Sequence, residues 1–219
     1  MTYDGQSPTN NKKYLEVDLN YIKARWDNRA DRWDEDLKDM NSHLNRDNSY
    51  ERFFTIFDSI LYNEVDLKNK SFLDLACGTG ALLERYCFFF KQSIGVDISE
   101  KMLLKAKEKN LVNTKLIKKD CFHFFDEKMR FDYIASRGVL LSHYGEKNSI
   151  LLLSDIYKSL NKNGILFIDA LNIGNQHNPK CKTLYNQEQL CKIFNNSGFS
   201  NIKIYVELNY PLLYIKAQK

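Results

Sequence analysis

The sequence predicts an α/β fold built around a mostly parallel sheet. Strand-like and helix-like segments alternate between residues 71 and 170, which is the pattern of βαβ units in which helices cover a parallel sheet. Two of only nine glycines lie in one short turn that directly follows a buried strand. The last two strand-like segments are joined by residues 209–211 alone, which predicts an antiparallel hairpin at the sheet.

Length and composition are those of one globular domain with an added segment. The chain has 219 residues, of which 43% are hydrophobic and 27% charged, and its formal net charge is +4. No apolar run reaches the roughly 18 residues of a membrane span, and the polar residues 1–13 lack the apolar stretch of a signal peptide. The five cysteines show no CxxC spacing, which argues against a disulfide framework or a metal site. We therefore expect a cytoplasmic protein with no bound metal and no membrane partner.

Two amphipathic helices are expected before the first strand. Residues 14–45 place apolar side chains three or four positions apart, Trp26 and Trp33 among them, with charged side chains on the other face. Residues 49–63 repeat this spacing with phenylalanine, isoleucine and leucine. We therefore divide the chain into an N-terminal helical extension, residues 1–65, and a main domain, residues 66–219.

The main domain alternates strands and helices and ends in a helix followed by two strands. The expected strands are residues 71–76, 93–97, 115–118, 133–136, 165–170, 201–208 and 212–217. The expected helices are residues 81–90, 100–109, 150–160 and 187–196, with a short turn after Asp120. Asn163-Gly164 is a C-cap signal, so we expect the third of these helices to end there.

A glycine turn, residues 76–80, follows the first strand. In open parallel sheets ligands bind at the carboxyl ends of the strands, and glycine lets the backbone approach a ligand where a Cβ would collide. Asp97 closes the next strand, where its carboxylate can accept both hydrogen bonds of a ribose diol. With Asp74 and Asp120, it is expected to line one edge of the sheet.

Two phosphate-binding patterns are missing from this turn. The third glycine of a dinucleotide fingerprint is replaced by Leu83, and the sequence GxxxxGK[ST] does not occur. A ligand with a ribose and few or no phosphates therefore fits the pattern best.

These segments resemble the ordered motifs of class I S-adenosylmethionine-dependent methyltransferases. Residues 72–80 (FLDLACGTG) are very similar to the first motif of that family, and Gly95-Val96-Asp97-Ile98-Ser99 resembles the second. The third and fourth motifs and the turn before the fifth strand resemble residues 119–122, 131–141 and 160–166. The resemblance covers about residues 70–206 and implies a Rossmann-like three-layer sandwich. Its sheet would be seven-stranded and mostly parallel, with a C-terminal antiparallel hairpin strand.

The resemblance also implies S-adenosylmethionine as the cofactor and a role for each motif residue. Asp74 would face the methionine amine, Asp97 would hold both ribose hydroxyls, and Asp120 would accept from the adenine amino group. The residues expected around the cofactor are Trp26, Trp33, Asp74, Ala76, Cys77, Gly78, Gly80, Asp97, Ile98, Met102, Asp120, Cys121, Phe122 and Ser136. For Trp26 and Trp33 two interpretations stay open: a lid over the cofactor, or two core residues on one face of a helix.

His143, Arg137 and Tyr144 are the catalytic candidates. They follow the fourth strand, which lies beside the methyl group in the resembled fold. His143 can take a proton at neutral pH, and it can equally be a structural hydrogen-bond partner. Arg137 can hold an anionic group of the substrate, or the carboxylate of the cofactor. Residues 172–184 are the expected specificity loop.

The preferred interpretation is an enzyme that methylates an O or N atom of a small polar metabolite, as a monomer or homodimer. A nucleic-acid methyltransferase is an alternative, but the Asn/Asp-Pro-Pro-aromatic tetrapeptide is absent and a charge of +4 offers no broad phosphate track. A non-catalytic cofactor-binding partner protein is a second alternative, since a fold does not determine a function. A dinucleotide-dependent reductase is a third, which Leu83 disfavours.

Overall fold

A computed structural model describes residues 18–35, 49–62, 64–125, 129–138, 140–173, 183–207 and 210–219, without the side chains of residues 49 and 50. Residues 1–13 and most of the expected specificity loop, residues 172–184, lie outside this part of the chain.

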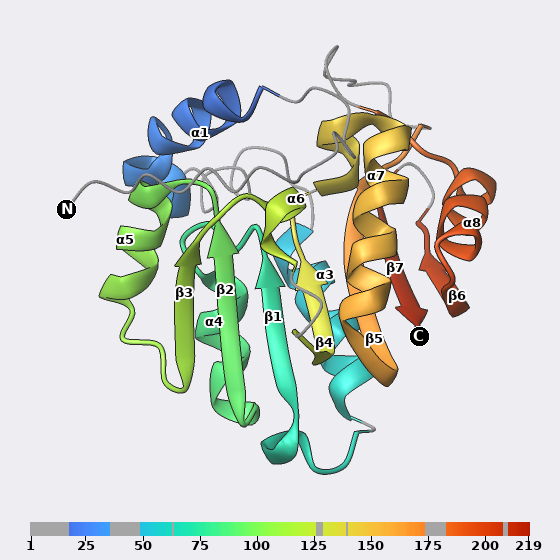
Figure 1. The fold of residues 1–219 in the computed structure, drawn as a ribbon, viewed down its shortest axis with the longest axis horizontal. Helices are drawn as coiled ribbons and strands as arrows, with labels where there is room; N and C mark the ends of the chain where they lie inside the picture. Colours follow the sequence, from blue (N-terminus) through green and yellow to red (C-terminus); the bar gives the residue numbers. More distant parts are fainter. Residues whose placement is uncertain are drawn as a thin grey trace, which may run out of the picture.

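In the described residues, seven strands form one twisted sheet in the order β3-β2-β1-β4-β5-β7-β6 (Figure 1). The strands are β1 (Ser71–Leu75), β2 (Gln92–Asp97), β3 (Thr114–Lys118), β4 (Phe131–Ser136), β5 (Leu160–Leu171), β6 (Ser200–Tyr205) and β7 (Leu212–Gln218). The first five in chain order pair in parallel, whereas β7 is antiparallel to both of its neighbours. The predicted α/β fold with its antiparallel C-terminal strands is confirmed.

Helices cover both faces of this sheet. The helices are α1 (Leu19–Asp27), α3 (Ser49–Tyr62), α4 (Ala81–Tyr86), α5 (Glu100–Glu108), α6 (Cys121–Phe124), α7 (Leu140–Ser159) and α8 (Gln187–Asn196). Short 3-10 turns are η1 (Ala30–Arg32), η2 (Leu67–Asn69) and η3 (Cys87–Phe89). In Figure 1, α7 lies in front of β4 and β5, and α3 and α4 lie behind the sheet. Among the described residues, no helix has the length and apolar character to cross a membrane.

Alternation along the strands divides the core between these two faces. Leu73 and Leu75 of β1 pack in the cluster on the α7 and α8 side. Phe72 faces the other cluster, on the α3 and α4 side, where the rings of Phe57 and Phe167 stack 5.3 Å apart. The buried aromatic rings of α3 therefore hold the N-terminal extension onto the back of the sheet.

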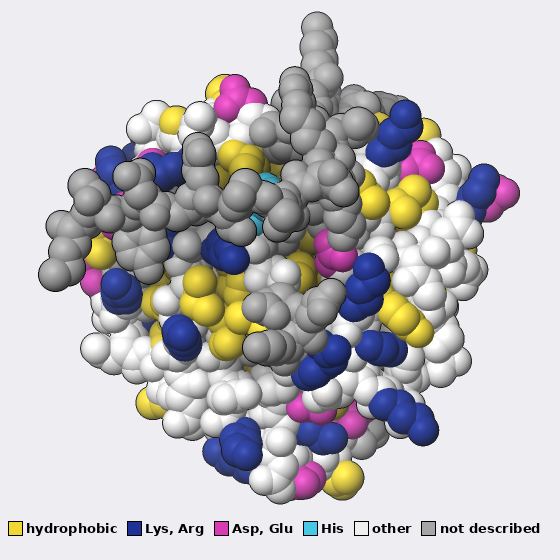
Figure 2. Space-filling model, in the orientation of Figure 1, with side chains coloured by type: hydrophobic (Ala, Val, Ile, Leu, Met, Phe, Trp, Pro, Cys, Tyr) yellow, Lys and Arg dark blue, Asp and Glu magenta, His cyan; other side chains and the backbone are white. Residues whose placement is uncertain are grey.

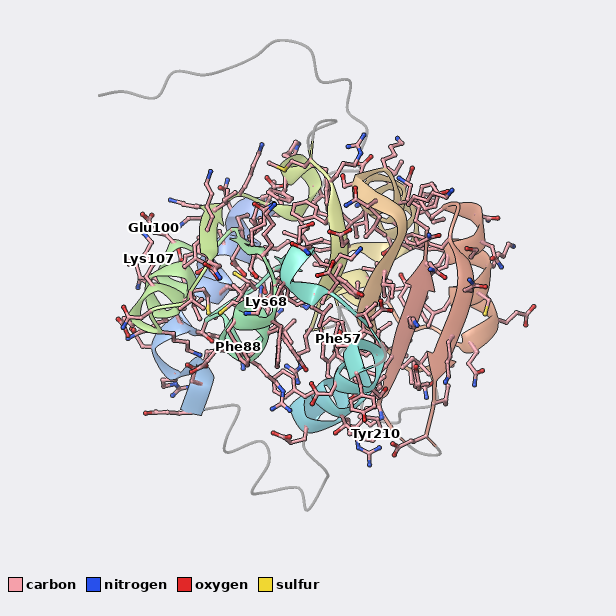
Figure 3. All side chains as sticks on the ribbon, turned by 90° about the horizontal axis from the view of Figure 1, so that it is seen from below. Phe57, Lys68, Phe88, Glu100, Lys107 and Tyr210 are labelled. Carbon is pink, nitrogen blue, oxygen red and sulfur yellow. The ribbon has the colours of Figure 1, made fainter. Side chains whose placement is uncertain are left out.

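The single helix expected over residues 14–45 is wrong for the part that the structure describes. Asp18 caps α1 by accepting from the Tyr21 amide at 2.8 Å, and α1 ends at Asp27. A turn follows, then η1. The apolar spacing runs through the break because both segments cover the same site, and spacing does not report whether a helix is continuous. Both Figure 1 and Figure 3 show α1 beside α5, whose Glu100 and Lys107 are labelled at the left edge of Figure 3, away from Phe57 of α3.

The helix cap expected at Asn163-Gly164 is also wrong, although the expected last helical residue, 160, is one residue from the observed end. Helix α7 ends at Ser159, and Leu160 already pairs with Phe131 in the sheet. Asn163 takes a left-handed φ of 64°. Gly164 is required for a different reason than capping, because a Cβ there would lie 2.9 Å from the Asn161 carbonyl oxygen.

Likewise, the helix expected over residues 81–90 ends earlier, at Tyr86, and continues as η3. The helix expected to begin near residue 150 begins at Leu140 and contains a kink at Gly145, with φ of 77°.

Candidate cofactor site at the carboxyl ends of the strands

The glycine turn after β1 uses left-handed backbone at three positions. Ala76, Gly78 and Gly80 have φ values of 60°, 53° and 80°. At Gly80 the helix α5 passes so close that a Cβ would lie 3.2 Å from the Cβ of Ala106. The Cys77 amide donates to the Val96 carbonyl at 2.9 Å and ties the turn to β2. The turn therefore presents backbone rather than side chains at the edge of the sheet.

Asp97, the last residue of β2, connects this turn to the loop that follows β2. Its Oδ2 accepts from the Gly78 amide and its Oδ1 from the Ser99 amide, both at 2.8 Å. Only 7% of Asp97 is exposed, and burial raises the pKa of its carboxyl to about 6 despite these donors. Each carboxylate oxygen has a second lone pair, so Asp97 can still accept two further hydrogen bonds.

Asp74 lies deeper, one residue inside the end of β1 and across from Gly95 and Ala135. It is 1% exposed, and its Oδ2 has no hydrogen-bond partner among the residues that the structure describes. Burial and the neighbouring charge of Asp97 raise the pKa of this carboxyl well above its usual value. A buried carboxyl oxygen without a donor is rare in proteins, so this atom can receive a donor from a ligand.

Asp120 follows β3 and caps α6. Its Oδ1 accepts from the amides of Phe122 and His123 at 3.0 Å and lies 2.8 Å from His123 Nδ1. These contacts orient the carboxylate at the edge of the sheet, beside the buried Cys121 and Phe122.

A pocket of about 40 Å³ opens between these strand ends and α1. Its lining is Leu19, Ile22, Trp26, Ala76, Val96, Asp97, Ile98, Lys119, Asp120, Cys121 and Tyr144. Asp97 and Asp120 thus line one pocket, whereas Asp74 does not reach its surface.

Two of the other expected cofactor residues are engaged within the protein. Met102 is 1% exposed inside α5. The Ser136 hydroxyl donates to the Leu75 carbonyl at 2.6 Å, and Ser136 is also 1% exposed. The Ser136 hydroxyl therefore joins β4 to β1 and does not point to solvent.

Trp26 and Trp33 lie over this site. Their rings meet edge to face with centroids 5.2 Å apart, and the Arg29 guanidinium lies over both. Trp33 reaches the glycine turn, because a Cβ on Gly78 would lie 3.9 Å from its indole Nε1.

The catalytic candidates occupy two places. The His143 ring lies 6.1 Å, centroid to centroid, from Trp26. Tyr144 lines the pocket and packs on Phe122 at 4.6 Å, and burial raises the pKa of its phenol well above the usual value. Tyr144 therefore stays protonated at neutral pH, and it is suited to the pocket wall rather than to proton abstraction.

Arg137 follows β4, next to a carboxylate that sequence reasoning missed. The Gly138 amide donates to both oxygens of Asp169, at 3.0 and 3.3 Å, and Asp169 is 1% exposed. The pairing of Ser136 with Ile168 sets Arg137 beside Asp169 on the face that also carries Tyr214. The signal in the sequence was a lone acidic residue in an otherwise apolar strand, Ile165-Leu166-Phe167-Ile168-Asp169-Ala170-Leu171.

This sheet order, with a glycine turn after β1 and a carboxylate closing β2, is that of a Rossmann-like fold, in which ligands bind at the carboxyl ends of the strands. The methyltransferase domain family matches residues 72–164, the part of the chain that runs from β1 into β5.

Two curated proteins are similar in sequence. A ubiquinone biosynthesis O-methyltransferase of Pelagibacter ubique is 31% identical over 119 residues, which cover 48% of this chain and 44% of that relative. A protein of Haemophilus influenzae is 39% identical over 110 residues, or 46% of this chain and 42% of that protein. The chain thus spans less than half the length of the curated relatives it matches.

Solved structures share the whole fold at low identity. Magnesium protoporphyrin IX methyltransferase from Synechocystis, with S-adenosylmethionine bound, superposes with a TM-score of 0.69 at 17% identity, over 94% of this chain and 98% of that one. DhpI in complex with SAH gives 0.68 at 13% identity, over 91% and 95% of the two chains. Residues 72–164 therefore match the methyltransferase domain family, and the chain shares the fold of these two solved structures, as the motifs predicted.

Proposed function

We propose that this chain transfers the methyl group of S-adenosylmethionine to an O or N atom of a small polar metabolite. The observation that carries the proposal is the pair of contacts to Asp97, whose two oxygens are fixed by the Gly78 and Ser99 amides at the pocket edge. A carboxylate held in this way can accept from both hydroxyls of a ribose.

The chemistry of the surrounding donors and acceptors fits this cofactor. Asp97 and Asp120 are acceptors in the pocket lining, and Asp74 keeps a buried oxygen without a donor among the described residues. Acceptors suit the hydroxyls, the adenine amino group and the ammonium of S-adenosylmethionine, whereas a dinucleotide requires donors for its phosphates.

The part played by this chain in the reaction is to bind, orient and exclude water. When bound, the cofactor supplies a methyl group on a sulfonium, which is already a strong electrophile. Asp97, Asp120 and the glycine turn hold it at the strand ends, and Trp26 covers the pocket and shields it from water. His143, next to Trp26, is the residue that we assign to accept a proton from the methyl acceptor.

A small acceptor is favoured over nucleic acid by the surface. Figure 2 shows Lys and Arg side chains in several separate places on this face, with acidic side chains among them. A nucleic-acid enzyme needs a continuous basic track for phosphates. The proposal includes a cytoplasmic location, which the unpatterned cysteines of the sequence support.

Calorimetry with S-adenosylmethionine and with its demethylated product, S-adenosylhomocysteine, tests the binding part. We expect micromolar binding that requires Asp97. A screen of small hydroxyl and amino compounds for methyl transfer tests the reaction. Absence of cofactor binding to the folded chain contradicts the whole proposal, and methylation of nucleic acid alone contradicts the choice of acceptor.

A further inference from the structure

The segment of residues 18–35, which contains α1 and η1, sends two carboxylates into the two loops of the cofactor site. Asp27 Oδ1 accepts from the Ser99 hydroxyl at 2.6 Å. Asp34 Oδ1 accepts from the Thr79 hydroxyl, also at 2.6 Å. Ser99 is 0% and Thr79 2% exposed, so both hydroxyls are directed at these carboxylates rather than at solvent.

Both contacts lead to Asp97. The residue that contacts Asp27, Ser99, donates its amide to Asp97 Oδ1. The residue that contacts Asp34, Thr79, directly follows Gly78, whose amide donates to Asp97 Oδ2. Each oxygen of Asp97 is therefore oriented by a loop that one carboxylate of the N-terminal segment holds.

The same segment forms one wall of the pocket. Leu19, Ile22 and Trp26 lie on this wall, and the volume between it and the strand ends is only about 40 Å³. Sites for small molecules usually measure about 300–1,000 Å³. A nucleoside-sized ligand therefore needs this segment to move outward before it enters or leaves.

We propose that Asp27 and Asp34 are positioning residues that latch the N-terminal segment onto the two cofactor loops and control exchange of the cofactor. The inference rests on the proposed function only in naming S-adenosylmethionine as the ligand. With the latch closed, the loops around Asp97 are held in place and the ligand is enclosed. Exchange requires the hydroxyls of Ser99 and Thr79 to lose their carboxylate partners.

The chain supplies a matched control. Asp31 lies in the same segment between the two latch residues and has an ion pair of 3.7 Å to Lys105. Its side chain is 77% exposed, so the contact is weak. Asp31→Asn makes the same chemical change as Asp27→Asn and Asp34→Asn without touching a cofactor loop.

The dissociation rate of S-adenosylhomocysteine, measured by stopped flow on the full chain, tests the latch. We expect Asp27→Asn and Asp34→Asn each to raise this rate by about tenfold, because a hydrogen bond to a charged acceptor is replaced by a weaker one to a neutral amide oxygen. Asp31→Asn should leave it unchanged. Equal rates in all three variants and the wild type overturn the latch.

A measurement without ligand separates this outcome from failure of the proposed function. Both tryptophans of the chain, Trp26 and Trp33, lie in the segment. Acrylamide should quench their fluorescence more strongly in Asp27→Asn and Asp34→Asn than in Asp31→Asn, at an unchanged unfolding temperature. If the wild type binds no S-adenosylhomocysteine, the proposed function fails while quenching still decides on the latch.

A double-mutant cycle covers the case in which one latch variant does not fold. Asp34→Ala, Thr79→Val and their combination should show non-additive quenching, because the two side chains share one hydrogen bond. Additive effects in this cycle contradict a contact between the segment and the glycine turn.

Discussion

The two halves of the sheet differ in how their polar groups are held. At the ends of β2 and β3, carboxylates accept hydrogen bonds from backbone amides of the turns beside them, as Asp97 and Asp120 do. At the ends of β4, β5 and β7, the polar residues face one another across strands, with Asp169 paired to Tyr214 and set beside Arg137. The first half is built by local motifs, and the second by strands distant in the sequence. The proposed function places the cofactor at the first half and the methyl acceptor at the second.

Removal of Asp97 is the largest expected effect and tests the first half. Asp97→Ala removes two acceptors for the ribose and leaves the Gly78 and Ser99 amides without their partner. We expect affinity for S-adenosylhomocysteine to fall by about 1,000-fold, since each hydrogen bond to a charged group contributes about 1.5–3 kcal/mol. Calorimetry measures it, with Asp120→Asn as a comparison of smaller effect. Unchanged affinity removes the ribose assignment.

His143 tests the second half. His143→Ala should lower the turnover number by about 100-fold, the lower range of general-base catalysis, and should leave cofactor affinity within about threefold. Steady-state kinetics and calorimetry on the same preparation separate the two effects. Full turnover in this variant identifies His143 as structural.

Acidic pH acts on the first half through Asp97, whose pKa is raised to about 6 by burial. Between pH 7 and 5 we expect affinity for S-adenosylhomocysteine to fall about tenfold as this carboxylate becomes protonated.

Protonation of Asp97 changes the free energy of unfolding in the opposite direction to the cofactor affinity. Between the unfolded pKa near 3.8 and the folded value of about 6, the folded state binds more protons than the unfolded state. The contribution of Asp97 to the free energy of unfolding therefore rises as the pH falls through this window. Titration calorimetry and thermal unfolding at pH 7, 6 and 5 measure both, and Asp97→Asn should lose both dependences.

Asp169 gives the smallest expected effect and is a second test of the second half. Asp169→Asn keeps one acceptor for the Gly138 amide and removes the charge beside Arg137. We expect turnover to fall about fivefold, consistent with one weakened charge-assisted hydrogen bond, at unchanged cofactor affinity. Asp155→Asn on α7 is the control. A loss of cofactor affinity in Asp169→Asn contradicts the division between the two halves.

The sequence predicts more of the polar residues in the first half of the sheet than in the second, and the reason is physical. A left-handed turn needs glycine at fixed places, and a capping carboxylate lies within a few residues of the amides it binds, so Gly78, Gly80 and Asp120 leave a local pattern. Asp169 is not part of a local sequence pattern, because Gly138, whose amide it binds, is 31 residues away in the chain. Its only signal was a charge within an apolar strand.

The N-terminal segment shows the same limit. The spacing of apolar residues placed Trp26 and Trp33 on one face of a helix. It could not decide whether they form a lid over the cofactor or belong to the core. The break after Asp27 follows from contacts that no local pattern contains, since Asp27 reaches Ser99 across 72 positions and Asp34 reaches Thr79 across 45.

The sequence by itself determined the α/β class, the terminal antiparallel strands, the glycine turn and the acidic residue of the cofactor site. Each of these depends on side-chain alternation or on backbone conformations that few residue types adopt. Only the tertiary structure decided that α1 lines the pocket, that Asp27 and Asp34 accept from the hydroxyls of Ser99 and Thr79, and that Asp169 lies beside Arg137. These contacts join residues distant in the chain, and they exist only once the sheet has brought the strand ends together.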